Sequence, residues 1–421
     1  MNEAKKPLKL ISFLGVQDYS ETTYEWQGLS KTTKFTTVAC VEFLQPSEVI
    51  VFLTKDAETK NFAALEAELT SVPFKKIIVP LGQDQDELWK IFNTLNDAVA
   101  DGETIAMDVT NGQRSLPMLA LLTAAFMKTA RDISVKHLLY GAFDVGKSLG
   151  AQTTPMFDLS EMLNLLDWSV AADRFIRSGD SADMADLLKA FSEQVKKDGA
   201  YSDEAIKKAN PFTGAATSLN RVTNSLFFFR PYSAMREIHS LNKYLGRIIG
   251  LGKTENRMSP LYRLLEKIDQ SYLSMGNSTP ESGGADEIAK TLEQERKLIF
   301  WYRDHGHWMQ SVSLAREWLV SWFMYRAGEL DLIDRDLRKH YEEEINCFTK
   351  DSLGSKPLWR TNNFIGSFMD GKTFHDLWTE VRDIRNDIAH AGKNVDFNEA
   401  NALEKRIKKQ FVTIENMIVA A

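Results

Sequence analysis

The segment TIAMDVTNGQRSLP, residues 104–117, joins an apolar run to a polar turn and then to a helix start. Its first part, Thr104 to Val109, is short and mostly apolar, as in a buried β-strand. Ser115 suits the N-cap of a helix, and Pro117 suits the first helical turn. A strand that leads directly into a helix is the repeating unit of α/β folds, so the segment predicts that fold class.

Similar apolar runs lie on both sides of this segment, with amphipathic segments between them. The expected strands are Leu8 to Leu14, Val49 to Leu53, Lys76 to Val79, Thr104 to Val109 and His137 to Phe143. The expected helices are Asn61 to Leu69, Asp86 to Val99 and Leu116 to Thr129. This alternation predicts a doubly wound parallel sheet, whose ligands bind beyond the carboxyl ends of the strands. The loops Gly15 to Tyr24 and Thr110 to Ser115 are therefore expected to hold a ligand.

The turn from Thr110 to Ser115 has the chemistry of an anion site. Gly112 permits a close backbone approach, and Arg114 lies beside the N–H groups of the expected helix start. An ordinary strand-to-helix turn explains the same residues. No G-x-G-x-x-G occurs in the chain, and we expect neither a dinucleotide nor a nucleoside triphosphate as the ligand.

From Asp158 onward the strand pattern gives way to helical periodicity. A Gly179-Asp180 break separates the first two expected helices. The polar stretches Lys196 to Ser218 and Ser274 to Asp286 are expected to be loops or an insertion boundary. Beyond about Glu287 the spacing of apolar residues predicts a helical bundle. The clearest stripe consists of Trp308, Val312, Ala315, Leu319 and Trp322.

Length and composition narrow the class of protein. A chain of 421 residues, 43% hydrophobic and 26% charged, indicates two or three globular domains. The longest apolar stretch, Met118 to Met127, is too short to span a bilayer, and Met1 to Leu10 is not followed by the apolar run of a secretory signal. We therefore expect a cytoplasmic protein without a membrane partner. The net charge of -7 argues against duplex DNA as a partner.

The segment RNDIAH, residues 385–390, places an arginine, an amide and a histidine within six residues. These groups suit a metal-free ribonuclease, because RNA is cleaved by its own 2′-hydroxyl when protein groups move the protons and positive charge stabilises the transition state. The segment RDLRKH, residues 335–340, has the same spacing but lacks the amide, and we interpret it as a solvated helix face. His305-Gly306-His307 lacks a third ligand and is interpreted as a turn, so no metal site is expected.

The expected geometry of the terminal segment leaves alternatives open. His390-Ala391-Gly392 supplies a helix stop, so His390 lies in a last helical turn. On a straight helix Arg385 and His390 would lie roughly 140° apart. Local unwinding at His390, or a second copy of the chain, would bring such groups together. Alternatively, Arg385 pairs with Asp383 or Asp387 on the surface.

Three motifs together resemble a known family, the CARF-HEPN ribonucleases of type III CRISPR systems. They are Phe13-Leu14-Gly15 with Tyr19 and Tyr24, the segment DVTNGQRSLP at residues 108–117, and the terminal Arg385-Asn386 with His390. The resemblance implies a Rossmann-like CARF sensor domain over residues 1–157. It further implies a helical linker and insertion over 158–286, and an all-α HEPN ribonuclease domain over 287–421. The stretch from about Lys196 to Asp286 carries no motif that matches.

The resemblance also implies an activity and its partners. Two CARF domains of a homodimer, or of a higher oligomer, would bind one cyclic oligoadenylate, with cyclic tetra-adenylate as the expected ring, and thereby activate cleavage of single-stranded RNA without a catalytic cofactor. Arg385, Asn386 and His390 would be catalytic. The activator-binding residues would be Gly15, Gln17, Tyr19, Thr110, Asn111, Gly112, Arg114 and Ser115. Asn111 stands where relatives often have histidine.

Two rival functions use the same motifs. A ligand-responsive transcription regulator could carry this sensor domain, but it would need a basic recognition helix, and none precedes the C-terminal bundle. A nuclease-inactive HEPN scaffold is the second rival. A ribonuclease assay with and without cyclic oligoadenylate separates it from the active enzyme.

Overall fold

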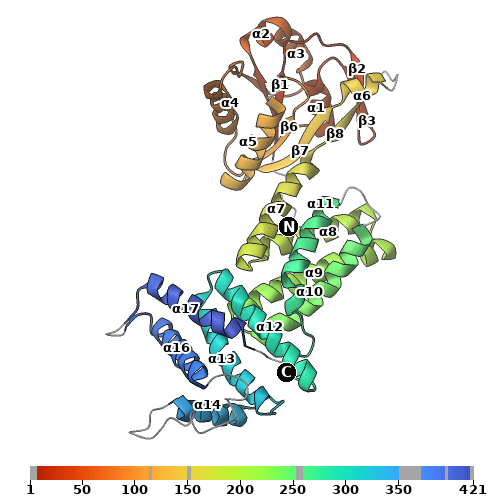
Figure 1. Ribbon diagram of the computed structural model, residues 1–421. Coiled ribbons are helices and arrows are strands. Elements are labelled where there is room, and N and C mark those ends of the chain that lie inside the picture. Colours follow the sequence, from red (N-terminus) through yellow and green to blue (C-terminus); the bar gives the residue numbers. More distant parts are fainter. Residues whose placement is uncertain are drawn as a thin grey trace. The chain divides into compact units, whose positions relative to one another are not determined.

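The computed structural model describes residues 7–112, 116–148, 153–252, 259–349, 371–393 and 397–417. The chain divides into two compact units, Met1–Asp167 and Trp168–Ala421 (Figure 1). The boundary falls within helix α7, Ser160–Ser178. The three-part division expected from the sequence stays a prediction.

The first unit is built on a sheet with the strand order β3-β2-β8-β7-β6-β1-β4-β5. Its strands are β1 Leu8–Leu14, β2 Thr22–Trp26, β3 Leu29–Thr33, β4 Glu48–Leu53, β5 Phe74–Ile78, β6 Thr104–Asp108, β7 Ser134–Gly141 and β8 Thr153–Asp158. The five strands from β7 to β5 pair in parallel, and each corresponds to one of the expected strands. The predicted α/β fold class is confirmed for this unit.

The sheet is mixed, which corrects the expectation of a purely parallel sheet. Strand β8 runs antiparallel to β7, and β2 and β3 form an antiparallel hairpin. The hairpin turn is Gln27-Gly28, with φ values of 49° and 80°, so both residues lie in the left-handed region that a tight hairpin requires. The sequence analysis missed this hairpin because its strands are short and polar, and Gln is a less typical turn residue than Asn. Pro155 hid β8, because proline is unusual in a paired strand.

Helices cover both faces of the sheet (Figure 1). One buried core includes residues of α1, Thr36–Leu44, and of the segment formed by α2, Lys55–Ala57, π-helix η1, Glu58–Phe62, and α3, Ala63–Glu68. The other core includes residues of α4, Gln85–Asp97, and α5, Leu116–Ala130. A short helix α6, Phe143–Ser148, follows β7. This two-sided burial explains why the central strands are nearly continuous apolar runs.

The second unit is helical throughout its described residues. Its helices beyond α7 are α8 Ala182–Asp198, α9 Asp203–Phe227, α10 Pro231–Gly252, α11 Ser259–Tyr272, the 3-10 turn η3 Leu273–Met275, α12 Ala285–Asp304, α13 Trp308–Arg326, α14 Arg335–Thr349, α16 Gly371–Ala389 and α17 Ala400–Glu415. One buried core runs from Trp168 to Met417. The expected stripe on α13 is largely buried, and so are side chains on its other faces, since α13 lies inside the bundle.

Helix α9 overturns the loop expected at Lys196 to Ser218. It is 25 residues long and contains Pro211, a residue that normally interrupts a helix. Its buried stripe, which includes Phe212, Leu219 and Val222, belongs to the core of this unit. Tertiary packing therefore outweighs the polar composition and the proline. Among the described helices, none is long and apolar enough to cross a membrane.

Candidate functional site

Strands β1 and β6 are neighbours at the centre of the sheet. Among the five parallel strands, β4, which follows β1 in the sequence, lies on one side of this pair, and β7, which follows β6, lies on the other. In a doubly wound sheet this is the switch point, where a crevice forms beyond the carboxyl ends of the strands. The loop after β1 begins at Gly15, and the loop after β6 contains Thr110, Asn111 and Gly112. The structure thus brings together the two loops that the sequence analysis selected.

Asn111 joins these loops directly. The Gln17 side-chain amide donates to Asn111 Oδ1 at 3.0 Å, and Asn111 Nδ2 donates to Thr36 Oγ1 at 3.2 Å. Thr36 begins helix α1, an element that the sequence analysis did not assign. Three segments far apart in the chain therefore meet at one amide side chain.

The Gly15 loop is held in place before any ligand arrives. Asn61 Nδ2 donates to the carbonyl oxygens of Gly15 and Gln17, each at 2.9 Å, and the Gly15 amide donates to the Tyr19 hydroxyl at 2.9 Å. Because the Tyr19 oxygen accepts there, its own proton stays available for donation. Burial raises the pKa of Tyr19 far above its usual value, so the hydroxyl keeps that proton at neutral pH.

Asp108, the last residue of β6, holds the start of the loop from Thr110 to Gly112 in place. It is fully buried, and its two carboxylate oxygens accept from Ser12 Oγ at 2.8 Å and from the Thr110 amide at 3.0 Å. Burial raises the pKa of Asp108, while these hydrogen bonds oppose the rise. Thr110 Oγ1 accepts from the Gly141 amide at 2.8 Å, so this hydroxyl ties the loop to the end of β7.

Six of the eight expected activator-binding residues lie in these two loops: Gly15, Gln17, Tyr19, Thr110, Asn111 and Gly112. Gly112 has φ +112°, a value that favours glycine. Arg114 and Ser115 lie outside the described residues. The sequence analysis missed Thr36 and Asn61, since a threonine opening an unassigned helix and a polar helix residue carry no distinctive pattern.

Residues 9–144 match a family model described as the CARF domain of the CRISPR system endoribonuclease Csx1. The matched region contains both loops. The chain is also 31% identical over 133 residues to the CRISPR-associated protein MJ1674 of Methanocaldococcus jannaschii, over 30% of this chain and 21% of that relative. The match therefore spans about a fifth of the curated relative's length. The N-terminal part of the chain is similar to a CARF domain, a type of ligand-sensing domain.

Residues 141–148, GAFDVGKS, fit the pattern G-x-x-x-x-G-K-S of a phosphate-binding loop, which the expectation against nucleoside triphosphates overlooked. That pattern requires a strand, a glycine-rich loop and then a helix. Here α6 already begins at Phe143, two residues after the first glycine, and the next described element is strand β8. The structural context therefore does not fit a phosphate-binding loop.

The terminal motif lies at the end of α16. The His390 amide still donates to the Asn386 carbonyl at 3.0 Å, so the helix is not unwound at His390. The next two amides close the helix: Ala391 donates to the Ile388 carbonyl, and Gly392 donates to the Asp387 carbonyl. Ala391, with φ 54°, takes the left-handed position. His390 therefore lies at a helix C-terminus, which favours a positive charge there.

The alternative in which Arg385 pairs with Asp383 or Asp387 is wrong among the described residues. Asp383 contacts Arg382 at 3.0 Å. Asp387 is 7% exposed and accepts from the backbone and side chain of Asn398, at 3.0 and 2.8 Å, which ties the end of α16 to the approach to α17. Arg385 forms no ion pair with any residue that the structure describes. Asn386 and Arg385 are half-buried, and His390 is exposed.

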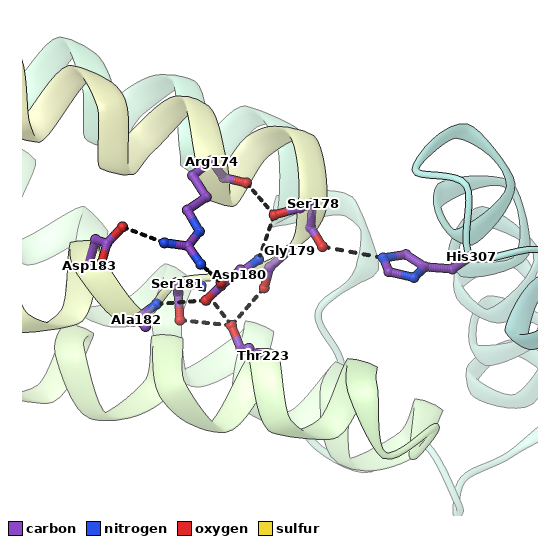
Figure 2. A network of polar contacts seen from close by, with 9 residues as sticks. All are labelled: Arg174, Ser178, Gly179, Asp180, Ser181, Ala182, Asp183, Thr223 and His307. Atoms are coloured by element: carbon purple, nitrogen blue, oxygen red, sulfur yellow. Dashed lines mark hydrogen bonds and ion pairs between the residues drawn. The ribbon is translucent and has the colours of Figure 1, made fainter. Parts of the chain in front are cut away.

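The other two segments that contain histidines are His305-Gly306-His307 and residues 335–340. His305 and His307 lie in the turn between α12 and α13, as expected, and their Nε2 atoms approach the carbonyl oxygens of Ile176 and Ser178 at 2.7 and 3.3 Å. Figure 2 shows His307 beside the end of α7. His340 is exposed on α14. Within the described ranges, no cluster of three or more metal-ligating side chains is present.

Proposed function

We propose that this chain is an endoribonuclease of type III CRISPR defence, activated by a cyclic oligoadenylate and independent of metal. The similarity of residues 9–144 to a CARF domain supports the sensing half of the proposal. The proposed cleavage rests on one observation about Arg385. Its side chain is partly exposed, lies five residues before His390 and makes no ion pair within the described part of the chain.

The sensor would bind the activator at the carboxyl ends of β1 and β6. Cyclic tetra-adenylate presents adenine edges and phosphates, which amide side chains, backbone N–H groups and a guanidinium recognise. Gln17 and Asn111 supply the amides, and Arg114 supplies the positive charge. Because Asn61 and Asp108 already hold both loops, little conformational entropy is lost on binding.

Cleavage would use the RNA's own 2′-hydroxyl as the nucleophile. One imidazole takes the proton from the 2′-hydroxyl, whose oxygen attacks the phosphorus, and the bond to the 5′-oxygen breaks as that oxygen receives a proton. The products carry 2′,3′-cyclic phosphate and 5′-hydroxyl ends. Arg385 stabilises the charge that builds on the phosphate, and Asn386 orients His390 or the phosphate.

A homodimer completes this site. Arg385 and His390 lie roughly 140° apart around one regular helix, so one chain alone presents them to different sides. Two α16 C-termini that face each other across a two-fold axis would hold both His390 side chains near one phosphate of single-stranded RNA.

The test is cleavage of labelled single-stranded RNA in EDTA, with each of the cyclic tri-, tetra- and hexa-adenylates. His390→Ala and Arg385→Ala should each lower the rate by roughly 10²- to 10⁴-fold, because each removes proton transfer or charge stabilisation. His340→Ala, the matched control on α14, should keep the rate.

A divalent-metal requirement, or a loss confined to His340→Ala, would discard this mechanism. Activator binding without any cleavage would favour the nuclease-inactive scaffold instead.

A further inference from the structure

A pocket of about 420 Å³ lies in the helical unit, and its lining contains none of the expected catalytic or activator-binding residues. It is formed by the start of α10, by α12 and α13, and by the segment that leads into α14. Its apolar lining includes Phe229, Leu314 and Leu332. Its volume lies within the range of pockets that bind small molecules.

One wall of the pocket holds a buried acid that the fold leaves unsatisfied. Glu295 is 5% exposed, and its Oε2 atom is buried without a hydrogen-bond partner in the described residues. Burial raises the pKa of Glu295 to about 8, against the attraction of Arg338. A buried polar atom without a partner is costly, so a group that donates to or accepts from Glu295 would recover that energy.

Arg338 does not satisfy this oxygen in the structure, because both terminal nitrogens of its guanidinium donate elsewhere. Its guanidinium donates to Glu317 at 2.7 Å, to Ser321 Oγ at 2.8 Å and to the Leu332 carbonyl at 2.8 Å. The ion pair with Arg338 also neutralises the carboxylate of Glu317. Among the buried side-chain atoms left without a partner in the described residues, the one that belongs to this pocket lining is Glu295 Oε2.

Another part of the pocket lining has the opposite chemistry. Pro231, Tyr232 and Ser233 form the first turn of α10, a helix of 22 residues. Pro231 has no N–H, and the amides of Tyr232 and Ser233 lie where a helix offers no intrahelical acceptor. Arg230 precedes this turn, lines the pocket and is exposed; one nitrogen of its guanidinium donates to the Phe228 and Phe229 carbonyls at 3.3 and 3.2 Å. Free amides, a helix N-terminus and a guanidinium together attract an anion such as a phosphate.

We propose that this pocket binds a nucleotide, either free or as one residue of an RNA strand. The hydrogen-bonding edge of the base meets Glu295, the apolar walls cover the base, and the phosphate lies at the start of α10 beside Arg230. A simple amine would satisfy Glu295 alone, and inorganic phosphate would satisfy only the start of α10 and Arg230. A nucleotide has both groups, joined by a ribose. The proposal does not depend on the ribonuclease activity.

The test is isothermal titration of the full chain with AMP, GMP, CMP and UMP, with the matching nucleosides, and with a short single-stranded RNA. Glu295→Gln should change the affinity for at least one base by about tenfold or more, because it alters the hydrogen bond to the base edge. Arg230→Ala should weaken the monophosphates but not the nucleosides. Arg236→Ala, a control on the same helix whose side chain pairs with Glu281, should change neither.

Ile333→Trp tests the place of binding, because Ile333 is 55% exposed and lines the pocket, so a larger ring there fills it without disturbing the core. It should abolish the signal. A heat signal that survives in Ile333→Trp comes from another site, such as the CARF-like crevice, and would overturn the proposal, as would the absence of any nucleotide or RNA binding. Binding of the RNA but of no monophosphate would identify the occupant as an RNA residue.

Discussion

Gly15 and Gln17 form a close pair at the candidate activator site. The Gln17 side chain folds over Gly15 so tightly that a Cβ atom on residue 15 would lie 2.1 Å from Gln17 Oε1. This fold of the side chain also brings Gln17 Nε2 to Asn111. A residue without a side chain at position 15 therefore sets the position of the amide that joins the two loops.

Gly15→Ala should weaken activator binding while it leaves the unfolding free energy nearly unchanged. The side chain of Gln17 is flexible, so it should move aside with a change in unfolding free energy of less than about 1 kcal/mol. The Gln17–Asn111 hydrogen bond would be lost, and activator affinity should fall about tenfold. Calorimetry and urea unfolding measure the two effects. Gly246→Ala, where a Cβ meets nothing within 4 Å, is the control, and equal affinities in both variants would contradict this role of Gln17.

Glu295 should make stability depend on pH in a defined window. Burial raises its pKa from the ordinary value of 4.5 to about 8, while Arg338 opposes this shift and Glu317 adds to it. Between those pH values the folded chain keeps a proton that the unfolded chain has lost, so its stability falls as the pH rises from 4.5 to about 8 and levels off above.

Glu295→Gln removes this titration and keeps the shape of the side chain. The unfolding free energy of the variant minus that of the wild type should therefore increase with pH across this window, by roughly 1.4 kcal/mol per pH unit at most. Urea unfolding at pH 5 and pH 8 measures the change. Parallel pH curves for the two proteins would show that Glu295 titrates normally.

At the scale of elements, the junction of α7 and α8 is held by a polar network (Figure 2). Thr223 of α9 donates to the Gly179 carbonyl at 2.7 Å and accepts from the Ser181 amide at 3.0 Å. Arg174 contacts Asp180 and Asp183 across the turn. These contacts fix the direction in which the chain leaves α7, the helix that contains the boundary between the units.

Gly179 is required in this junction for two reasons. Its φ of +75° disfavours any side chain, and a Cβ atom would lie 2.6 Å from Cη2 of Trp301. Gly306 has nearly the same φ, +74°, but a Cβ there meets nothing within 4 Å. Comparison of the two glycines therefore separates backbone strain from steric overlap.

Gly179→Ala should destabilise the chain more than Gly306→Ala does. Backbone strain should cost each variant about 1–2 kcal/mol, and the overlap with the rigid Trp301 ring should cost Gly179→Ala about 1–3 kcal/mol more. Chemical denaturation followed by tryptophan fluorescence measures the difference. Equal losses would mean that the Trp301 ring moves aside without cost.

At the scale of the whole molecule, the proposed sensor loops and the proposed catalytic residues belong to different units. The loops after β1 and β6 lie in the first unit, and α16 with His390 lies in the second. Two separate sites can be coupled only through states whose equilibrium both sites influence, so a mutation at one site should leave the other site's local chemistry intact.

Arg114→Ala and His390→Ala should therefore have opposite effects. Arg114→Ala should weaken cyclic-oligoadenylate binding and raise the concentration needed for activation, while saturating activator restores much of the cleavage. His390→Ala should bind activator normally and fail to cut. Calorimetry together with RNA cleavage over an activator titration measures both. If activator binding and the activation curve were both unchanged in Arg114→Ala, the loop from Thr110 to Ser115 would not be part of the activator-binding site.

Local patterns were enough to predict the central strands, three helical segments between them and the helical character of the second half, but not α1 or α6. Burial on both faces of a sheet or on one face of a helix leaves a direct periodicity in the sequence. Local patterns also selected the two loops at the switch point and the terminal Arg385-Asn386-His390 segment. The same patterns failed where distant packing decides the structure. Helix α9 forms across Pro211 because its apolar stripe is buried, and β8 pairs between β7 and β2 despite Pro155.

Only the tertiary structure decided which polar groups meet. Asn111 contacts residues that are 94 and 75 positions away in the chain, and no spacing rule links Asn61 to Gly15. The orphaned oxygen of Glu295 has the same origin, since a glutamate on a helix normally faces water and only the surrounding helices bury it. Periodicity records which face of an element is buried, but hydrogen-bond partners and burial across the chain depend on where the elements pack, which one local segment does not determine.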